Sequence, residues 1–128
     1  HHINNVIIPA LKKGKLVISD RFADSTFVYQ GYVNKFGIEQ TKNLHKKLLN
    51  NFLPNKTFLF ELSTKLIISR LKDRKLKNKY DKLDKKFHDS VNKGYKLISK
   101  NNRFIKIDAS KSINQIHYKI INYINSLI

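Results

Sequence analysis

The chain has no cysteine, methionine or tryptophan, and only four glycines and two prolines among its 128 residues. Without cysteine it can form neither a disulfide nor a thiolate metal site, which suits a reducing cytosol, so we expect a cytoplasmic protein. No hydrophobic run reaches the length of a membrane span and no signal-peptide pattern is present, so no membrane association is expected. The initiator methionine is also missing, and His1 stands inside a helical pattern. We therefore expect the chain to be a piece of a longer protein.

Acidic residues are scarce, with 9 Asp and Glu against 26 Lys and Arg, for a formal net charge of +17. Such an excess would suit a nucleic-acid-binding module. Only four of the basic residues are arginine, however, and the lysines are spread along the whole chain. The aromatic residues fall mainly at apolar-periodic positions, which indicates core packing rather than base stacking. We expect no specific nucleic-acid partner, and a non-catalytic basic binding domain remains the alternative from another functional class.

Hydrophobic periodicity predicts strands that alternate with helices. The predicted strands are residues 15–19, 57–62 and 103–108, and the predicted helices are residues 2–13, 25–31, 38–51, 63–71, 81–98 and 112–124. Ser25 and Ser63 are predicted to cap two of these helices, and Gly14 to end the first. Such alternation indicates an α/β fold with a parallel sheet covered by helices. Three strands make an incomplete sheet of this kind, so part of it is expected elsewhere.

The most informative segment is the end of the predicted strand at residues 15–19, where Asp20 and Arg21 follow directly. In open α/β sheets ligands bind at the carboxyl ends of the strands. A guanidinium binds two phosphate oxygens with its planar fork, and a carboxylate can hold a metal-bound water. The pair therefore predicts a phosphate site, with a structural ion pair as the alternative.

The motifs around this pair resemble those of the thymidylate kinase family. The matching positions of the first block are His2, Val6, Ile7, Pro9, Ala10, Leu11, Gly14, Val17, Ile18, Asp20, Arg21, Phe22, Ser25, Val28, Tyr29, Gln30 and Gly31. Weaker later blocks match at Phe87, Val91, Gly94, Tyr95, Ile107, Asp108 and Ala109. The resemblance implies a P-loop nucleoside-monophosphate-kinase-like parallel sheet flanked by helices. Residues 1–128 would be the C-terminal part of one such domain, supplying the third, fourth and fifth of its five strands.

The resemblance also implies phosphoryl transfer from ATP to dTMP, giving dTDP, with Mg²⁺ as cofactor and a homodimer at full length. It assigns Arg21 to the dTMP phosphate, Asp20 to the vicinity of the magnesium ion, and Tyr29 to the sugar, where its ring would exclude a 2′-hydroxyl. Thr26 is assigned to the thymine edge. The predicted substrate-binding residues are Arg21, Ser25, Thr26, Tyr29, Gln30 and Tyr80. A kinase for another deoxynucleotide or deoxynucleoside is the alternative within the superfamily, against which the Tyr-Gln-Gly ending argues.

The polar stretch of residues 70–81 resembles the family's lid, with a solvated charge run as the alternative. Arg70, Lys72 and Arg74 would close over ATP and neutralise charge on the transferred phosphoryl group. Asp81 is a second candidate for the metal, through water, and Asp108 and Ala109 lie where the adenine-side loop begins. Together with Arg70 and Arg74 they are the predicted ATP-binding residues. The chain departs from the family pattern at Lys79, Asp81 and Asn92.

A glycine-rich phosphate loop of the form G-x4-G-K-[ST] is absent, since the four glycines are scattered. The family carries this loop before the point at which the chain begins. We therefore expect the chain alone not to phosphorylate dTMP.

Overall fold

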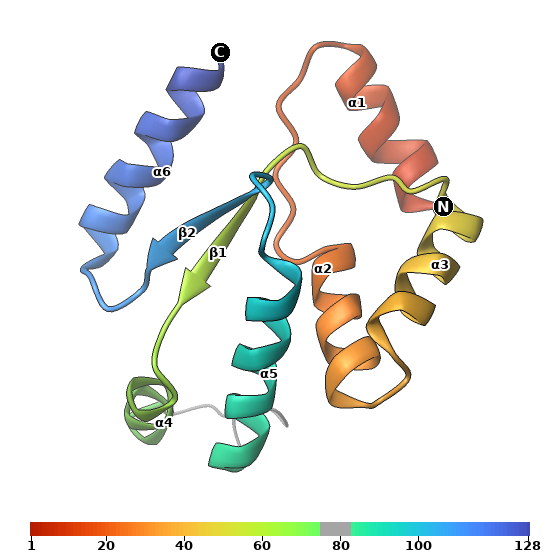
Figure 1. Cartoon of the computed structure of the whole chain (residues 1–128). Helices are drawn as coiled ribbons and strands as arrows, with labels where there is room; N and C mark the ends of the chain where they lie inside the picture. Colours follow the sequence, from red (N-terminus) through yellow and green to blue (C-terminus); the bar gives the residue numbers. More distant parts are fainter. Residues whose placement is uncertain (75–82) are drawn as a thin grey trace.

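The computed structural model describes residues 1–74 and 83–128, and Figure 1 shows its elements. In the described residues, helices precede the first strand, separate the two strands and follow the second. With η denoting a π-helix, the elements are η1 (Ile3–Ile7), α1 (Ile8–Lys12), α2 (Ala23–Thr26), η2 (Phe27–Val33), α3 (Ile38–Leu49), β1 (Thr57–Glu61), α4 (Thr64–Lys72), α5 (Lys85–Ile98), β2 (Phe104–Asp108) and α6 (Ile113–Leu127). In the described part of the chain, the predicted alternation is confirmed only from β1 onward, where helices follow each strand.

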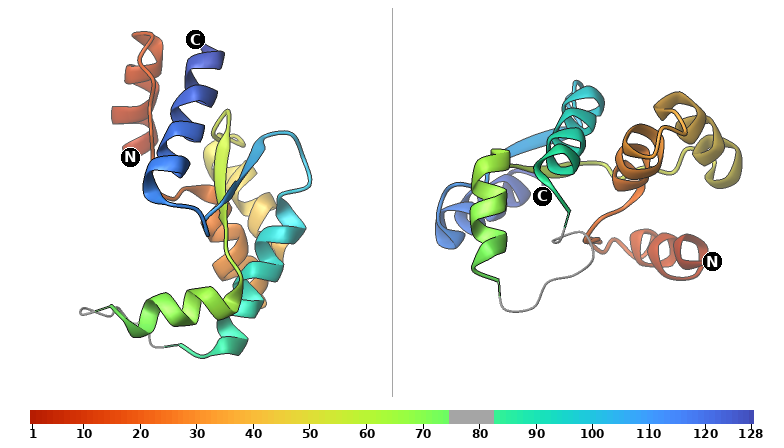
Figure 2. Two further views of the ribbon diagram at one scale, coloured as in Figure 1. Left: turned by 90° about the vertical axis from the view of Figure 1, so that its left-hand side faces the viewer. Right: turned by 90° about the horizontal axis from the view of Figure 1, so that it is seen from below.

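The two strands form a parallel sheet in which Thr57 pairs with Phe104 and Glu61 pairs with Asp108. Side chains of successive strand residues point to opposite faces. Leu59 packs into the core shared with α5 and η2, whereas the ring of Phe58 meets Tyr123 of α6 edge-on at 5.6 Å. Helices therefore cover both faces, and Figure 2 shows α5 between α4 and the α2–η2 helix. The parallel α/β class is confirmed, while the numbering of the strands within a larger sheet stays a prediction.

The strand predicted at residues 15–19 is wrong, because the structure has no strand there. Leu16 and Ile18 are 61% and 79% exposed. A strand needs a neighbour to pair its backbone N–H and C=O groups. In the described residues β1 and β2 pair only with each other, so residues 15–19 have no strand to pair with despite their alternating apolar pattern.

Local hydrogen bonds explain where the first helix ends. Gly14 has a φ of +71°, its N–H donates to the carbonyl of Leu11, and the N–H of Lys15 donates to the carbonyl of Ala10. This pair of bonds is the Schellman motif, which favours glycine because other residues are strained at positive φ. The predicted stop at Gly14 is confirmed.

The predicted cap at Ser25 is wrong. The backbone is extended at Phe22, α2 begins at Ala23, and the N–H of Ser25 already donates to the carbonyl of Phe22. The Ser25 hydroxyl is therefore inside the helix and makes tertiary contacts instead. The cap at Ser63 is confirmed, since its hydroxyl accepts from the N–H of Leu66.

The remaining helices differ little from expectation. The predicted start of the α6 helix at Ser112 is confirmed by a capping box with Gln115. The α5 helix begins at Lys85, later than predicted, because the Asp84 carboxylate caps it by accepting from the N–H of Phe87.

The core lies between the sheet, η2 and α5. Its buried members are Ala23, Phe27, Val28, Leu59, Ile98 and Phe104. Gly94 allows α5 to approach η2 closely, because an added Cβ there would lie 2.9 Å from Cγ1 of Val28. The expected inward faces of α3 and α4 are only partly covered, with Leu48 70% exposed and Leu66 41% exposed.

A buried ion pair ties the start of α2 to the beginnings of both strands. Nη1 and Nη2 of Arg103 donate to the two carboxylate oxygens of Asp24 at 2.8 and 2.6 Å. The Thr57 hydroxyl donates to the same carboxylate at 2.9 Å and accepts from Arg103 at 2.7 Å. Every partner in this network is satisfied, so the pair fixes the position of α2 against the sheet.

Candidate functional site

Arg21 stands directly before α2 in an unusual backbone conformation. Its φ of +69° lies in the left-handed region, which costs a non-glycine residue on the order of 1–3 kcal/mol. The Ser19 hydroxyl donates to the Arg21 carbonyl at 3.0 Å and supports this conformation. Such strain persists only where the surroundings hold it, and it is often found at functional sites.

The Arg21 side chain lies along the helix that follows it. Its Nε donates to the Ser25 hydroxyl at 3.2 Å, and its Cζ lies 4.6 Å from the centre of the Tyr29 ring. The spacing of four residues places these three side chains in one row on the helix surface. The ring of Tyr29 in turn lies 6.1 Å from that of Phe87 on α5. The structure thus brings together three of the predicted substrate-binding residues, Arg21, Ser25 and Tyr29.

The other predicted residues of this segment border the row. Thr26 and Gln30 are exposed and follow Ser25 and Tyr29 in the sequence, so they lie on the adjoining side of the helix and not in the row itself. Asp20 is exposed next to Arg21. Tyr80 lies outside the described residues.

Tyr95 joins the row from α5, because its hydroxyl lies 3.1 Å from the Ser25 hydroxyl. Tyr95 is not among the predicted site residues, although the Gly94-Tyr95 motif is part of the resemblance. The two residues of that motif act together here, since Gly94 lets α5 approach η2 and thereby brings Tyr95 next to α2.

Tyr95 also lines a hollow of about 590 Å³ at the carboxyl ends of the two strands. Such hollows are where ligands bind in open α/β sheets. Its lining includes Glu61, Asn92 and Asp108. The Asp108 carboxylate accepts from the hydroxyl and the N–H of Ser110, and these bonds hold its pKa below the ordinary value.

Residues 1–120 of the chain match the thymidylate kinase family. The chain belongs to this family. It is 39% identical over 129 residues to the thymidylate kinase of Wolbachia, covering 98% of this chain and 61% of that protein. The thymidylate kinase of Staphylococcus epidermidis is 37% identical over 130 residues (96% of this chain, 64% of that protein). That of Mesoplasma florum is 42% identical over 118 residues (90% and 56%). The chain spans about three-fifths of the length of the curated relatives it matches.

The segment predicted to be the lid is described only in part. Arg70 and Lys72 are exposed in the last turn of α4, and Arg74 follows the helix. Residues 75–82, which include Asp81, lie outside the described residues, so the rest of the predicted lid and the second metal candidate stay predictions. In the described part of the chain no three residues of metal-ligating type gather.

A polar cluster holds α4 against α5. The Thr64 hydroxyl donates to the Asp89 carboxylate at 2.5 Å, and Asn92 donates to Thr64 at 3.2 Å and to the Leu62 carbonyl at 3.3 Å. The Lys85 ammonium donates to the second Asp89 oxygen at 2.8 Å. The bonds from Lys85 and Thr64 hold the pKa of Asp89 below its ordinary value. Asn92, one of the departures from the family pattern, therefore has a structural role in this chain.

Ala109, predicted on the adenine side, is buried. Its N–H donates to the Glu61 carbonyl at 2.9 Å, which extends the pairing of the strands by one residue. The Ala109 N–H is therefore already bonded. Asp108 is exposed, so it is the more accessible of the two predicted residues.

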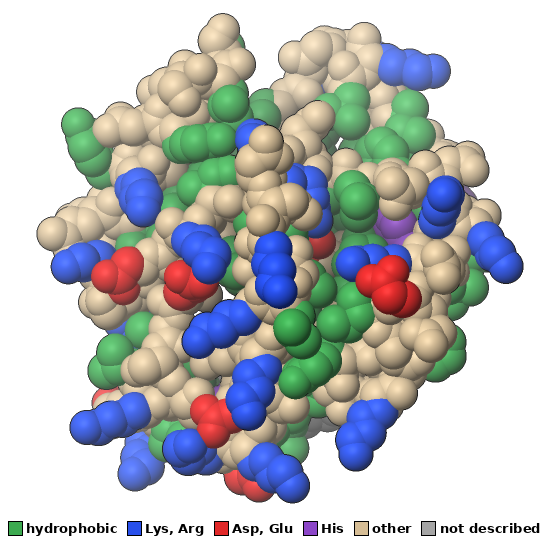
Figure 3. Space-filling model, in the orientation of Figure 1, with side chains coloured by type: hydrophobic (Ala, Val, Ile, Leu, Met, Phe, Trp, Pro, Cys, Tyr) green, Lys and Arg blue, Asp and Glu red, His purple; other side chains and the backbone are tan. Residues whose placement is uncertain are grey.

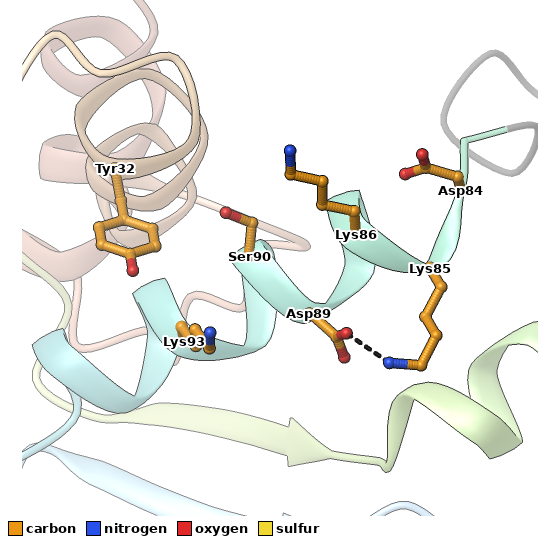
Figure 4. A pocket seen from close by; sticks show the side chains of 7 residues that line it. All are labelled: Tyr32, Asp84, Lys85, Lys86, Asp89, Ser90 and Lys93. Atoms are coloured by element: carbon orange, nitrogen blue, oxygen red, sulfur yellow. Dashed lines mark hydrogen bonds and ion pairs between the residues drawn. The ribbon is translucent and has the colours of Figure 1, made fainter.

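A second, shallower hollow of about 520 Å³ lies beside α5 (Figure 4). It is lined by Tyr32, Asp84, Lys85, Lys86, Asp89, Ser90 and Lys93. None of the predicted site residues lines it, and no motif in the sequence points to it.

Across the described residues, no helix is both long enough and apolar enough to cross a membrane.

Proposed function

We propose that the protein to which this chain belongs transfers a phosphoryl group from ATP to dTMP, giving dTDP. The observation that supports this proposal most is the row formed by Arg21, Ser25 and Tyr29. In it a fixed guanidinium lies on an aromatic ring at the start of a helix. The Arg21 guanidinium can bind a phosphate, and the Tyr29 ring can pack against a deoxynucleoside.

Within this proposal each side chain of the row has one task. Nε of Arg21 is bonded to Ser25, so Nη1 and Nη2 are the nitrogens that would bind two oxygens of the dTMP phosphate. The Tyr29 ring would pack against the sugar and leave no room for a 2′-hydroxyl. Thr26 would reach the thymine edge, and Gln30 would lie beside Tyr29 in the substrate site.

The donor side would be built from the end of α4. Arg70, Lys72 and Arg74 would neutralise negative charge on the transferred phosphoryl group, which is a large part of catalysis in this reaction class. Asp108 and Ala109 would lie near the adenine. The Asp20 carboxylate supplies the hard oxygen that Mg²⁺ prefers and is exposed next to Arg21, so it fits a magnesium ion held through water. Mg²⁺, when bound, would offset the charge of the ATP phosphates.

We further propose that the chain alone is inactive, because it has no glycine-rich loop to hold the ATP phosphates. The full-length protein would act as a cytoplasmic homodimer with dTMP and ATP as its ligands.

The test is the substrate preference of the full-length protein in a coupled assay of ADP release. We expect dTMP to be preferred over dUMP, dCMP and thymidine. A preference for one of the other three would assign the protein to a different nucleotide or nucleoside kinase. Tight, steeply salt-dependent binding of oligonucleotides without turnover would support the basic binding domain instead. The lysines are dispersed over the face in Figure 3, so we expect only weak binding of this kind.

A further inference from the structure

We propose that Tyr95 is a positioning residue that, through Ser25, fixes the Arg21 guanidinium in the orientation that binds the phosphate of dTMP. The inference rests on the proposed function of Arg21 as the phosphate ligand. Tyr95 lies on α5, whereas the group proposed to bind the phosphate, Arg21, lies before α2.

Arg21 needs such support because of its surroundings. Its side chain is exposed, and a long exposed side chain samples many rotamers unless something holds it. Its backbone is in the left-handed region, which few residues adopt without support. The Tyr29 ring restrains the plane of the guanidinium but not its rotation within that plane. The bond from Nε to Ser25 supplies that second restraint.

The hydrogen-bonding capacities of the three groups give the contact its direction. The arginine Nε can only donate, so the Ser25 oxygen accepts from it. The serine hydroxyl then keeps its own proton and one lone pair, and the Tyr95 hydroxyl at 3.1 Å can pair with either. Tyr95 thereby limits rotation of the Ser25 hydroxyl and keeps a lone pair directed to Arg21. The two terminal nitrogens of Arg21 remain for two phosphate oxygens.

The position of Tyr95 is itself well determined. It is half-buried and packs against the core cluster, and the neighbouring Gly94 is in close contact with Val28 and Tyr32 of η2. Tyr95 therefore approaches Ser25 from a helix that is fixed against η2. A hydroxyl on a fixed ring is a better restraint than one on a mobile side chain.

The first test follows the Arg21 Nε–H by ¹⁵N NMR in the unliganded chain. Only four arginines are present, and Arg21→Gln identifies the signal of interest. We expect Tyr95→Phe, which removes the hydroxyl and keeps the ring, to speed hydrogen exchange at Arg21 Nε severalfold. Tyr118→Phe on α6, where the side chain is 70% exposed, is the matched control and should leave that exchange rate unchanged. An unchanged rate in Tyr95→Phe would overturn the inference.

The second test compares the binding of dTMP and of thymidine by calorimetry. Since Tyr95 acts on the phosphate through Arg21, Tyr95→Phe should weaken dTMP binding roughly two- to tenfold, the range for one neutral hydrogen bond, and leave thymidine binding unchanged. Ser25→Ala should have at least the same effect on dTMP. Adding Tyr95→Phe to Arg21→Gln should cause no further loss, because the two residues act as one unit.

The outcomes separate this inference from the proposed function. If the chain and its Arg21→Gln variant bind dTMP equally, the phosphate role of Arg21 is wrong, and the inference falls with it. If Arg21→Gln weakens dTMP binding and Tyr95→Phe does not, the proposed function stands and the role of Tyr95 is wrong. An equal loss of thymidine binding in Tyr95→Phe would show a structural role only, and would also overturn the inference.

Discussion

Arginine side chains have two different roles in this chain. Arg21 is exposed and is held by neighbours on its own helix, whereas Arg103 is largely buried and pairs with both oxygens of Asp24. An exposed arginine with free terminal nitrogens can bind a ligand, and a buried one with all its charge compensated stabilises the fold. The surroundings of each arginine, and not its residue type, decide between these roles.

Asp24→Asn should destabilise the fold strongly. It leaves the Arg103 charge without its partner in a site where the two side chains are 18% and 7% exposed. Breaking a buried pair on one side costs about 3–5 kcal/mol. Chemical denaturation measures the loss. The matched control is Glu39→Gln, which breaks the exposed pair with Lys42 and should cost under about 1 kcal/mol. Equal losses in both variants would contradict this interpretation of the buried pair.

The sequence indicates some of these residue roles better than others. The Asp20-Arg21 pair and Tyr29 are predicted because they belong to a recognisable motif. The structure places Arg21 and Tyr29 in contact. Ser25 is predicted both as a helix cap and as a substrate-binding residue. The cap is wrong, and the contacts of its hydroxyl lie at positions 21 and 95. The contact to Tyr95 joins residues 70 positions apart, and no local pattern predicts it.

A small apolar core, a buried ion pair and a close glycine contact position the elements. The helix boundaries were largely predictable, because caps such as Ser63 and Ser112 are local signals. The strand at residues 15–19 was not, because pairing depends on a neighbour that an apolar pattern does not reveal. The same holds for the apolar face of α3, where Leu44 and Leu48 are 48% and 70% exposed.

Gly94→Ala should separate α5 from η2. An added Cβ would lie 2.9 Å from Val28, which belongs to the buried core, and 3.1 Å from Tyr32. Overpacking of this kind costs about 1–3 kcal/mol, which urea denaturation measures. Lys96→Ala, an exposed position on the same helix, is the control and should change stability little. A Gly94→Ala variant as stable as the parent would show that the contact is not tight.

The contact between α4 and α5 should weaken in acid. Hydrogen bonds from Lys85 and Thr64 hold the folded-state pKa of Asp89 below its ordinary value. A carboxylate of this kind stabilises the fold above its unfolded-state pKa, and this contribution is lost as pH falls through the folded-state value. We expect α4 signals in NMR spectra to shift as the pH is lowered below about 4. Lys85→Gln removes the main cause of the lowered Asp89 pKa and should move the titration of Asp89 to higher pH. An unchanged titration would contradict the role of Lys85.

At the scale of the whole molecule, the chain belongs to the thymidylate kinase family and spans about three-fifths of the length of the relatives it matches. Its described surface exposes large apolar side chains, among them Phe60 on β1 and Ile113 on α6, and hydrophobic side chains reach the face shown in Figure 3. The groups proposed to bind dTMP are present, whereas a loop for the ATP phosphates is not part of this sequence.

The chain alone should bind dTMP without turning it over. In a coupled assay of ADP release we expect no rate above background, against about 1–100 s⁻¹ for kinases in general. The full-length protein under the same conditions is the positive control. Turnover by the 128-residue chain in that range would show that a phosphate loop of the expected form is unnecessary.

The most direct test of the account is ³¹P NMR of dTMP titrated with this chain and with its Arg21→Gln variant. We predict that the phosphate resonance shifts with the parent chain, and that the variant abolishes the shift, because Nη1 and Nη2 of Arg21 would be the groups that contact the phosphate. Lys46→Gln on α3, which removes the same charge from an exposed position, should leave the shift intact. A phosphate resonance that responds equally to the parent chain and to Arg21→Gln would contradict the account.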